Sequence, residues 1–192
     1  MDQYENLKLL LSNNDNSYSA SGGYGYTDDL PPVTVSRQVI GPADLWGRSM
    51  SQIFSAVSPA MHDEFALQYE MKWLKRFGLT YYGCCEPLHR KIDILKKIPN
   101  LRKISMSPWI NFDEAVTNVG ANYVFSLKPS PACFAQATWN LAEARNDLRT
   151  KLAKTRNCIV EIVLKDISTV CYEPERLWEW TKMAGEEAEN CA

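Results

Sequence analysis

The 192-residue sequence lacks the long hydrophobic run that a membrane span requires. No window approaches about 18 uninterrupted apolar residues. The first ten residues, MDQYENLKLL, also lack the basic start and the apolar centre of a signal peptide. These absences predict a cytoplasmic protein with no membrane partner.

A strong charge of one sign is also missing. The 21 Lys and Arg are balanced by 23 Asp and Glu, the formal net charge is -2, and the basic residues are dispersed along the chain. A protein that follows a phosphate backbone usually carries a basic stripe, so the sequence predicts no nucleic-acid partner. With 45% hydrophobic and 23% charged residues, the composition is that of an ordinary globular protein.

Two familiar cysteine and glycine motifs are absent. The six cysteines contain no Cys-x-x-Cys spacing and no disulfide-scaffold pattern, so we expect them to be mostly reduced. The Gly-Gly-Tyr-Gly run at 22–25 is neither preceded by an apolar strand nor followed by Gly-Lys-Ser/Thr. A phosphate-binding loop needs both features, so this run is not predicted to bind phosphate.

The first 50 residues form an irregular N-terminal segment in this interpretation. Residues 12–32 are rich in Asn, Ser, Gly, Asp and Tyr and contain too few aliphatic residues for a core element. They predict loop with room for one short hairpin, and the segment could cover an edge of the sheet.

Residues 51–192 show strands alternating with helices. The Ser58-Pro59 pair predicts a helix start, and Gly78 predicts its end. Within this helix the residues that recur every fourth position predict a core-facing stripe: Met61, Phe65, Tyr69, Trp73 and Phe77. The predicted strands are 79–82, 101–107, 123–128 and 158–164, and the predicted helices that follow them are 88–95, 111–120, 141–156 and 174 onward.

Four successive strand-helix units predict an α/β fold with a parallel sheet. The chain is too short for a complete (β/α)8 TIM-barrel, which needs about 250 residues. We therefore expect a partial (β/α)8 barrel of about four C-terminal βα units, with residues 51–192 as the half-barrel domain. A small doubly wound sheet is the alternative.

Ligands of parallel α/β proteins bind at the carboxyl ends of the strands. Cys84, Cys85 and Glu86 follow the strand at 79–82 directly. Thiolates together with an imidazole suit Zn²⁺, so Cys84, Cys85 and His62 are the candidate metal ligands. His89 is a weaker candidate, and both cysteines could instead pack as small apolar side chains.

Further polar side chains follow the other strands. Lys128 and Lys165 each come one residue after an apolar run, with Asp166 adjacent, and two ammonium groups could bind an anionic substrate. Trp109 could stack on a flat ligand. The candidate substrate-binding residues are Ser107, Trp109 and Ser126.

Several of these segments resemble a known family. They are residues 58–70, the run YGCCEPL at 82–88, the strand and turn at 101–109, and Lys165-Asp-Ile-Ser168. In this order they are similar to the C-terminal half of proteins related to uroporphyrinogen decarboxylase, whose neighbours include the cobalamin-dependent methyltransferases. The resemblance spans roughly residues 40 to 190, implies the (β/α)8 barrel, and implies that an N-terminal half is missing.

The resemblance also implies a chemistry. In the methyltransferases a zinc ion activates a thiol that takes a methyl group from a corrinoid, so zinc and a corrinoid are the implied cofactors. Cys84 matches one zinc cysteine, whereas Tyr82 stands at the histidine position and Lys165-Asp166 at that of the last cysteine. Glu86, Lys128, Lys165 and Asp166 are the candidate catalytic residues.

The alternative function is a non-catalytic ligand-binding module or a subunit that another chain completes. Half a barrel exposes two unpaired strand edges and an inner face, and covering them requires association. The sequence therefore predicts a homodimer, or a separate chain that supplies the N-terminal half-barrel.

Overall fold

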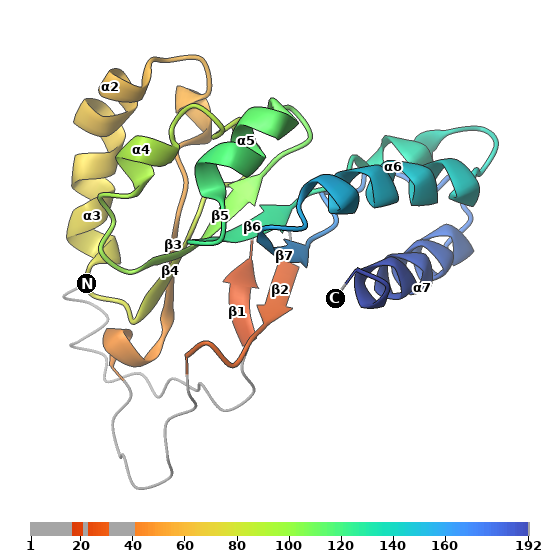
Figure 1. Cartoon of the computed structure of the whole chain (residues 1–192), viewed down its shortest axis with the longest axis horizontal. Helices are drawn as coiled ribbons and strands as arrows, with labels where there is room; N and C mark the ends of the chain where they lie inside the picture. The colour runs from red at the N-terminus through yellow and green to blue at the C-terminus, as the bar shows by residue number, and fades with distance from the viewer. Residues whose placement is uncertain (1–16, 21–22, 31–40, 192) are drawn as a thin grey trace, which may run out of the picture.

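The computed structural model describes residues 17–20, 23–30 and 41–191 (Figure 1). Within these residues no helix has the length and apolar character needed to cross a membrane. The predicted loop at residues 12–32 lies partly outside the described residues. Its described part contains the expected short hairpin, β1 (Ser17–Ala20) and β2 (Gly23–Tyr26), which pair in antiparallel fashion.

A parallel sheet of five strands forms the centre of the fold. The strands lie in the order in which they occur in the chain. They are β3 (Trp46–Ser49), β4 (Leu79–Tyr82), β5 (Leu101–Met106), β6 (Val124–Leu127) and β7 (Ile159–Ile162). The α/β class with a parallel sheet is confirmed.

The sheet differs from the prediction in one strand. The sequence predicts β4 to β7, but it places β3 in the irregular segment because Trp-Gly-Arg-Ser shows neither alternation nor a β-branched residue. A doubly wound sheet reverses its strand order at a switch point. The observed order contains no reversal, which argues against the doubly wound alternative.

Helices connect the strands, and α2 to α5 lie on one face of the sheet (Figure 1). They are α2 (Pro59–His62), the π-helix η3 (Asp63–Leu67), α3 (Gln68–Leu74), α4 (Ile92–Leu95), α5 (Phe112–Val119), α6 (Leu141–Lys154) and α7 (Glu175–Glu189), with 3-10 turns η1 (Pro42–Asp44), η2 (Gln52–Phe54) and η4 (Pro131–Ala135). The helix starts predicted at Ser58-Pro59, 111, 141 and 174 are confirmed to within one residue, whereas the helix predicted from residue 88 begins only at Ile92. Ser58 Oγ accepts a hydrogen bond from the Met61 backbone N–H at 3.2 Å, and Asn111 Oδ1 accepts one from Glu114 at 3.2 Å.

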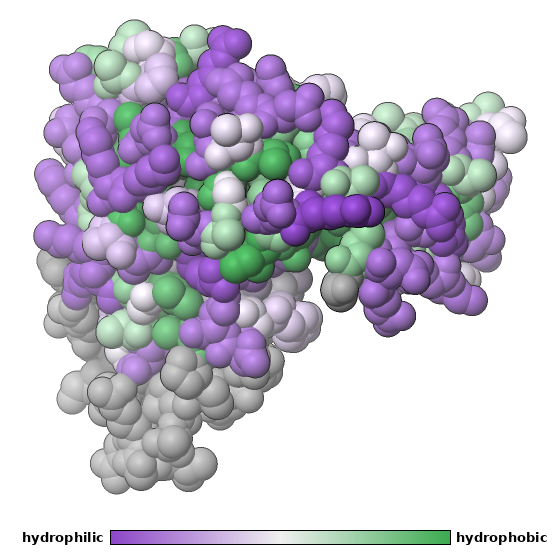
Figure 2. All heavy atoms as spheres, in the orientation of Figure 1, coloured by the Kyte–Doolittle hydropathy of each residue, from purple (hydrophilic) through white to green (hydrophobic). Residues whose placement is uncertain are grey.

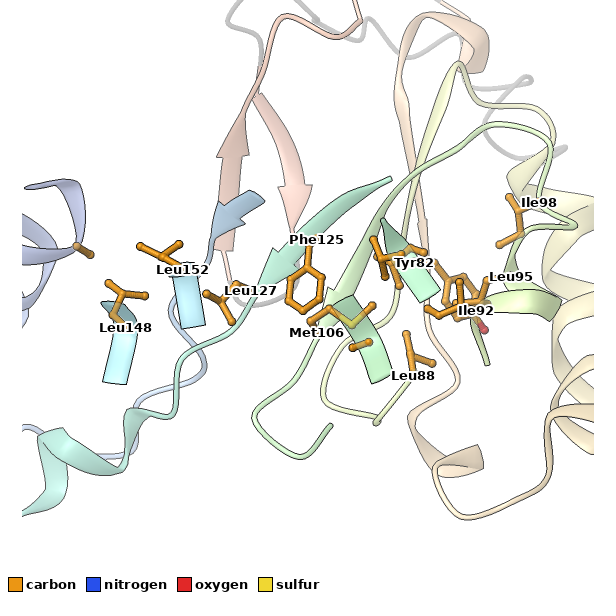
Figure 3. Packing of buried hydrophobic residues seen from close by; sticks show 14 of the residues in the cluster. Tyr82, Leu88, Ile92, Leu95, Ile98, Met106, Phe125, Leu127, Leu148 and Leu152 are labelled. Carbon is orange, nitrogen blue, oxygen red and sulfur yellow. The ribbon is translucent and has the colours of Figure 1, made fainter. Parts of the chain in front are cut away.

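The main hydrophobic core lies between this face of the sheet and the helices (Figure 3). Alternate strand residues enter it, because successive side chains of a strand point to opposite faces. The labelled members from the sheet are Tyr82, Met106, Phe125 and Leu127, and those from the helical layer are Leu88, Ile92, Leu95, Ile98, Leu148 and Leu152. Each such side chain contributes about 1.5–3 kcal/mol when it is fully buried.

The apolar stripe predicted to face this core is instead exposed. Met61, Phe65, Tyr69 and Trp73 are 46%, 54%, 58% and 38% accessible. The core side of the segment consists of Leu67 and Leu74, both fully buried, with Met71 partly buried between them. The prediction was wrong because the segment carries two apolar rows, and spacing alone does not decide which row meets the sheet.

The opposite face of the sheet is polar and is partly covered by the hairpin. Tyr18 of β1 is 3% exposed, and its ring packs against Trp46 with the centroids 4.8 Å apart. Its hydroxyl contacts Lys103 Nζ at 3.0 Å and Glu161 Oε2 at 2.5 Å. Gly25 makes room for the Tyr18 side chain, since a Cβ there would lie 2.4–2.6 Å from the Cε1, Cζ and hydroxyl oxygen of Tyr18. Trp46 is thus covered by the hairpin and does not face a ligand site.

Helices α6 and α7 pack against each other beside β7, to the right of the main sheet in Figures 1 and 2. Glu187 is 2% exposed and accepts hydrogen bonds from Arg145 Nη1 and Arg149 Nε, both at 2.6 Å. These charge-assisted bonds join the two helices.

Candidate functional site

The loop after β4 owes its shape to Gly83. This glycine has φ +104°, and a Cβ at the position would lie 2.5 Å from Leu88 Cδ1 and 3.0 Å from Ser105 Cβ. Only glycine adopts this conformation without strain. The strand therefore ends at Tyr82, and the chain turns before the two cysteines.

The turn brings the two thiols of adjacent residues together. On a continuing strand, neighbouring side chains would point to opposite faces. Here Cys84 Sγ and Cys85 Sγ lie 3.6 Å apart, and both residues are partly exposed. Because the strand ends before Gly83, the two thiols lie side by side and not on opposite faces of a strand.

The backbone of Cys84 is held in place from two neighbouring strands. Its carbonyl oxygen accepts hydrogen bonds from Ser105 Oγ at 2.7 Å and from Lys128 Nζ at 3.1 Å. The Cys85 side chain instead points toward the end of β7, where its Sγ lies 4.0 Å from Asp166 Oδ2. Burial, followed by the neighbouring Cys84 thiol, raises the pKa of Cys85, while Lys165 opposes the shift.

Glu86 has a structural part in this loop. Its side chain is 1% exposed, and its two oxygens accept backbone hydrogen bonds, one from Cys84 at 2.8 Å and one from Ser51 at 3.3 Å. The carboxylate therefore holds the loop after β4 against the segment after β3. The structure gives it no direct contact with the hollow described below.

The two predicted lysines differ in environment. Lys128 is 2% exposed, and burial lowers its pKa, although the nearby Cys84, Cys85 and Asp166 act in the opposite direction. Lys165 is partly accessible, and its Nζ lies 3.8 Å from Asp166 Oδ2. Lys165 is the better placed of the two for contact with a ligand, because it lines the hollow described below and Lys128 does not.

A small hollow of about 180 Å³ lies at this carboxyl edge. Trp109, which is 66% exposed, forms one wall, and Lys165 lies in the lining. The remaining lining residues are Ser130, Pro131, Ala132, Ala135, Ser168 and Thr169. The hollow combines a flat aromatic surface, one cation and hydroxyl groups from the segments after β5, β6 and β7.

Two predicted substrate-binding serines are buried below this surface. Ser107 is 1% exposed, and its Oγ accepts a hydrogen bond from the Trp109 backbone N–H at 3.4 Å. Ser126 is fully buried and lies 3.0 Å from the Tyr81 hydroxyl. Burial raises the pKa of Tyr81 to about 12. Ser107 thus positions the Trp109 turn, whereas Ser126 belongs to the polar interior of the sheet.

The three predicted zinc ligands do not meet. His62 is fully buried among the helices, where its Nε2 lies 2.7 Å from the Tyr82 hydroxyl, and burial lowers its pKa. That hydroxyl donates in turn to Glu70 Oε2 at 2.6 Å. Within residues 17–20, 23–30 and 41–191, no three His, Cys, Asp or Glu side chains are close enough together to hold a metal ion. The residues at 84, 85 and 62 therefore do not fit zinc.

His89 is not a ligand in this part of the structure either. Its Nε2 lies 3.9 Å from Glu114 Oε2 on α5, and burial lowers its pKa. Its backbone carbonyl also accepts a hydrogen bond from Asn118 Nδ2 of α5 at 2.9 Å, so His89 packs against this helix.

A larger cavity of about 600 Å³ lies away from these groups. It is enclosed by β7, α6 and α7, with Leu152, Val160, Ile162, Trp180 and Ala184 among its lining residues. Catalytic and binding groups of parallel α/β proteins collect at the carboxyl ends of strands. We therefore place the candidate site in the smaller hollow, where the polar groups converge.

Sequence reasoning missed part of the lining. Ser130, Ser168 and Thr169 stand in the segments that follow β6 and β7. Their signal in the sequence is weak, because hydroxyl residues after a strand more often form turns. Lys165 and Trp109, which the strand-end rule selected, both belong to the lining of this hollow.

Fold and site together define an α/β protein with a parallel sheet and a small polar hollow at its carboxyl edge. Neither a scan against protein-family models nor a search of curated proteins found a match for the chain.

Proposed function

We propose that the chain is part of a (β/α)8-type barrel and binds a small anionic molecule with a flat apolar portion at its carboxyl edge. Three features support the barrel. The parallel strands follow one another in chain order, helices follow the strands as in βα units, and helices α2 to α5 cover one face of the sheet. We also propose, from the sequence, that the protein is cytoplasmic.

The hollow lined by Trp109 and Lys165 is the observation that carries the proposed binding function. The exposed indole offers a stacking surface, and the Lys165 ammonium group offers a charge-assisted hydrogen bond to a carboxylate. The hydroxyls of Ser130, Ser168 and Thr169 are within the same lining. At about 180 Å³ the hollow is smaller than a drug-sized pocket, so a molecule with a single ring is the expected occupant.

Methyl transfer to a thiol, which the family resemblance implies, is less well supported by this site. The candidate zinc ligands are not assembled. A corrin ring is also far larger than the hollow. We therefore derive no step through either group, and we propose ligand binding in place of zinc-dependent methyl transfer.

Calorimetric titration of the full chain with benzoate tests the proposal, with benzamide as the uncharged analogue. Benzoate should bind and benzamide should bind more weakly, because only the carboxylate pairs with Lys165. Lys165→Met should weaken benzoate binding at least about tenfold, which corresponds to about 1.4 kcal/mol. Lys182→Met on α7 is the matched control and should have no effect. Equal affinity for benzoate in all three proteins would contradict the proposal.

Completion by a second copy is the other candidate function. Among the described strands, β3 and β7 each have one edge with no partner, and Phe65, Tyr69 and Trp73 expose an apolar row on the helices next to β3. Unpaired edges and exposed apolar rows favour association. We infer a homodimer, with a separate chain that supplies the N-terminal half-barrel as the alternative.

Sedimentation velocity at micromolar concentration tests the dimer. The wild-type chain should sediment as a dimer, and Phe65→Glu should shift it to a monomer because the charge falls within the apolar row. Trp178→Glu, at an aromatic residue on α7 that is 65% exposed compared with 54% for Phe65, should leave the dimer intact. A wild-type monomer at every concentration would contradict the homodimer.

A further inference from the structure

The adjacent thiols of Cys84 and Cys85 are not needed for carboxylate binding in the hollow, yet the fold places them together. A glycine at φ +104° ends the strand before them, and their sulfur atoms lie 3.6 Å apart at a partly exposed position. A disulfide bond needs a sulfur-sulfur distance of about 2.05 Å. The two sulfurs are therefore closer to bonding distance than an extended strand would allow, and a local rearrangement closes the gap.

We propose that Cys84 and Cys85 are a redox modification site, at which a small disulfide such as oxidised glutathione converts the two thiols into a disulfide between adjacent residues. The oxidation depends on the thiol pair alone and is measured separately from ligand binding. Only the expected effect of oxidation on ligand binding rests on the proposed function.

The reaction proceeds by two thiol-disulfide exchanges. The Cys85 thiolate attacks one sulfur of the small disulfide, which breaks the sulfur-sulfur bond and releases one small thiolate. The Cys84 thiolate then attacks Cys85 Sγ in the mixed disulfide and releases the second small thiolate. The protein thiols lose two electrons and two protons, and the small disulfide is reduced to two thiols.

The contacts assign the first step to Cys85. The Cys84 backbone is fixed at its N–H by Glu86 and at its carbonyl by Ser105 and Lys128. The Cys85 side chain contacts Asp166 and interacts with Lys165, and Lys165 is part of the lining of the hollow. We therefore take Cys85 as the attacking thiol and Cys84, whose backbone these contacts hold in place, as the resolving thiol.

Closure of the disulfide changes the binding site. The peptide between the two cysteines must turn as the sulfurs approach, and the Cys84 carbonyl is the acceptor for Lys128 Nζ. Cys85 also moves away from Lys165 and Asp166. We expect the oxidised protein to bind benzoate several-fold more weakly than the reduced protein.

The experiment equilibrates the full chain with graded ratios of oxidised to reduced glutathione, traps free thiols by alkylation, and identifies modified peptides by mass spectrometry. The peptide that contains both cysteines should lose two hydrogen atoms in mass at ratios where Cys133 and Cys158 are still alkylated. Cys84→Ser should stop the reaction at a glutathione adduct on Cys85. Cys133→Ser is the matched control and should leave the pair's oxidation unchanged.

The outcomes separate the two proposals. A pair that stays alkylated at every ratio, or wild-type protein that carries only glutathione adducts, overturns the redox site whatever the binding result. Disulfide formation in a protein that does not bind benzoate in either state supports the redox site and contradicts the proposed ligand. Disulfide formation with unchanged benzoate affinity overturns the inferred control of binding.

Discussion

The Tyr18 hydroxyl is the contact through which the N-terminal hairpin is held on the polar face of the sheet. It bridges Lys103 Nζ at 3.0 Å and Glu161 Oε2 at 2.5 Å, and these two charges also pair directly at 2.6 Å. Burial and the Glu161 carboxylate raise the pKa of Tyr18, so the hydroxyl keeps its proton and donates to Glu161.

Replacement of Tyr18 by Phe removes only this hydroxyl. The stacking against Trp46 remains, and Lys103 and Glu161 still pair with each other, so no buried charge is left alone. A hydrogen bond to a charged group is worth about 1.5–3 kcal/mol, and the surviving ion pair reduces the loss. We expect Tyr18→Phe to lower the free energy of unfolding by about 1–3 kcal/mol.

Tyr18→Ala removes the ring as well and should cost about 3–5 kcal/mol, the range for loss of a large buried aromatic side chain. Tyr24→Phe is the matched control on β2, because Tyr24 is 78% exposed. It should change stability by less than about 0.5 kcal/mol.

Urea unfolding followed by circular dichroism measures these differences, with the slope of the transition checked for constancy. A value for Tyr18→Phe equal to that of Tyr24→Phe would refute the bridging role of the hydroxyl. A Tyr18→Ala variant as stable as Tyr18→Phe would show that the ring adds nothing on this face.

Three further predictions follow from local contacts. Glu187 has a lowered pKa because Arg149, and then Arg145, donate hydrogen bonds to it. Its contribution to stability is therefore complete above the unfolded pKa of about 4.5 and is lost as the pH falls through the lower pKa of the folded state. Glu187→Gln should therefore reduce the dependence of the unfolding free energy on pH, measured between pH 3 and pH 6. Gly83→Ala should destabilise the protein by about 1–3 kcal/mol through its strained φ and its contact with Leu88, as judged by urea unfolding, and a neutral result would contradict the geometry after β4. Asn111→Ala should cost about 1 kcal/mol by removing the cap of α5, with thermal unfolding as the measurement, and Asn111→Asp should retain most of the stability.

The sequence predicted the parts of the fold that depend on local pattern. The β-branched run at 158–164 and the caps at Ser58 and Asn111 marked their elements directly, because strand pattern and capping chemistry are set by neighbouring residues. The strand-end rule also selected Trp109 and Lys165, which the structure places in the lining of one hollow, although the rule itself did not predict that they share it.

The predictions that were wrong depend on contacts between residues that are far apart in the sequence. The row from Met61 to Trp73 and the row of Leu67, Met71 and Leu74 both have helical spacing, and only packing decides that the second meets the sheet. The partner of His62 was missed for the same reason. The residue is fully buried against Tyr82, a contact that no spacing rule predicts, so it was assigned to a metal site that the structure does not form.

Binding of a small aromatic carboxylate in the carboxyl-edge hollow is measured through the indole N–H resonances in a proton-nitrogen NMR titration with benzoate. Trp109→Phe assigns the Trp109 signal, and Trp178, which is 65% exposed on α7, is the internal control. We expect a saturable shift of the Trp109 indole whose midpoint Lys165→Met moves to an at least about tenfold higher benzoate concentration, with Trp178 unchanged. A shift confined to Trp180, which lines the larger cavity beside α7, would contradict the claim by placing the ligand there instead.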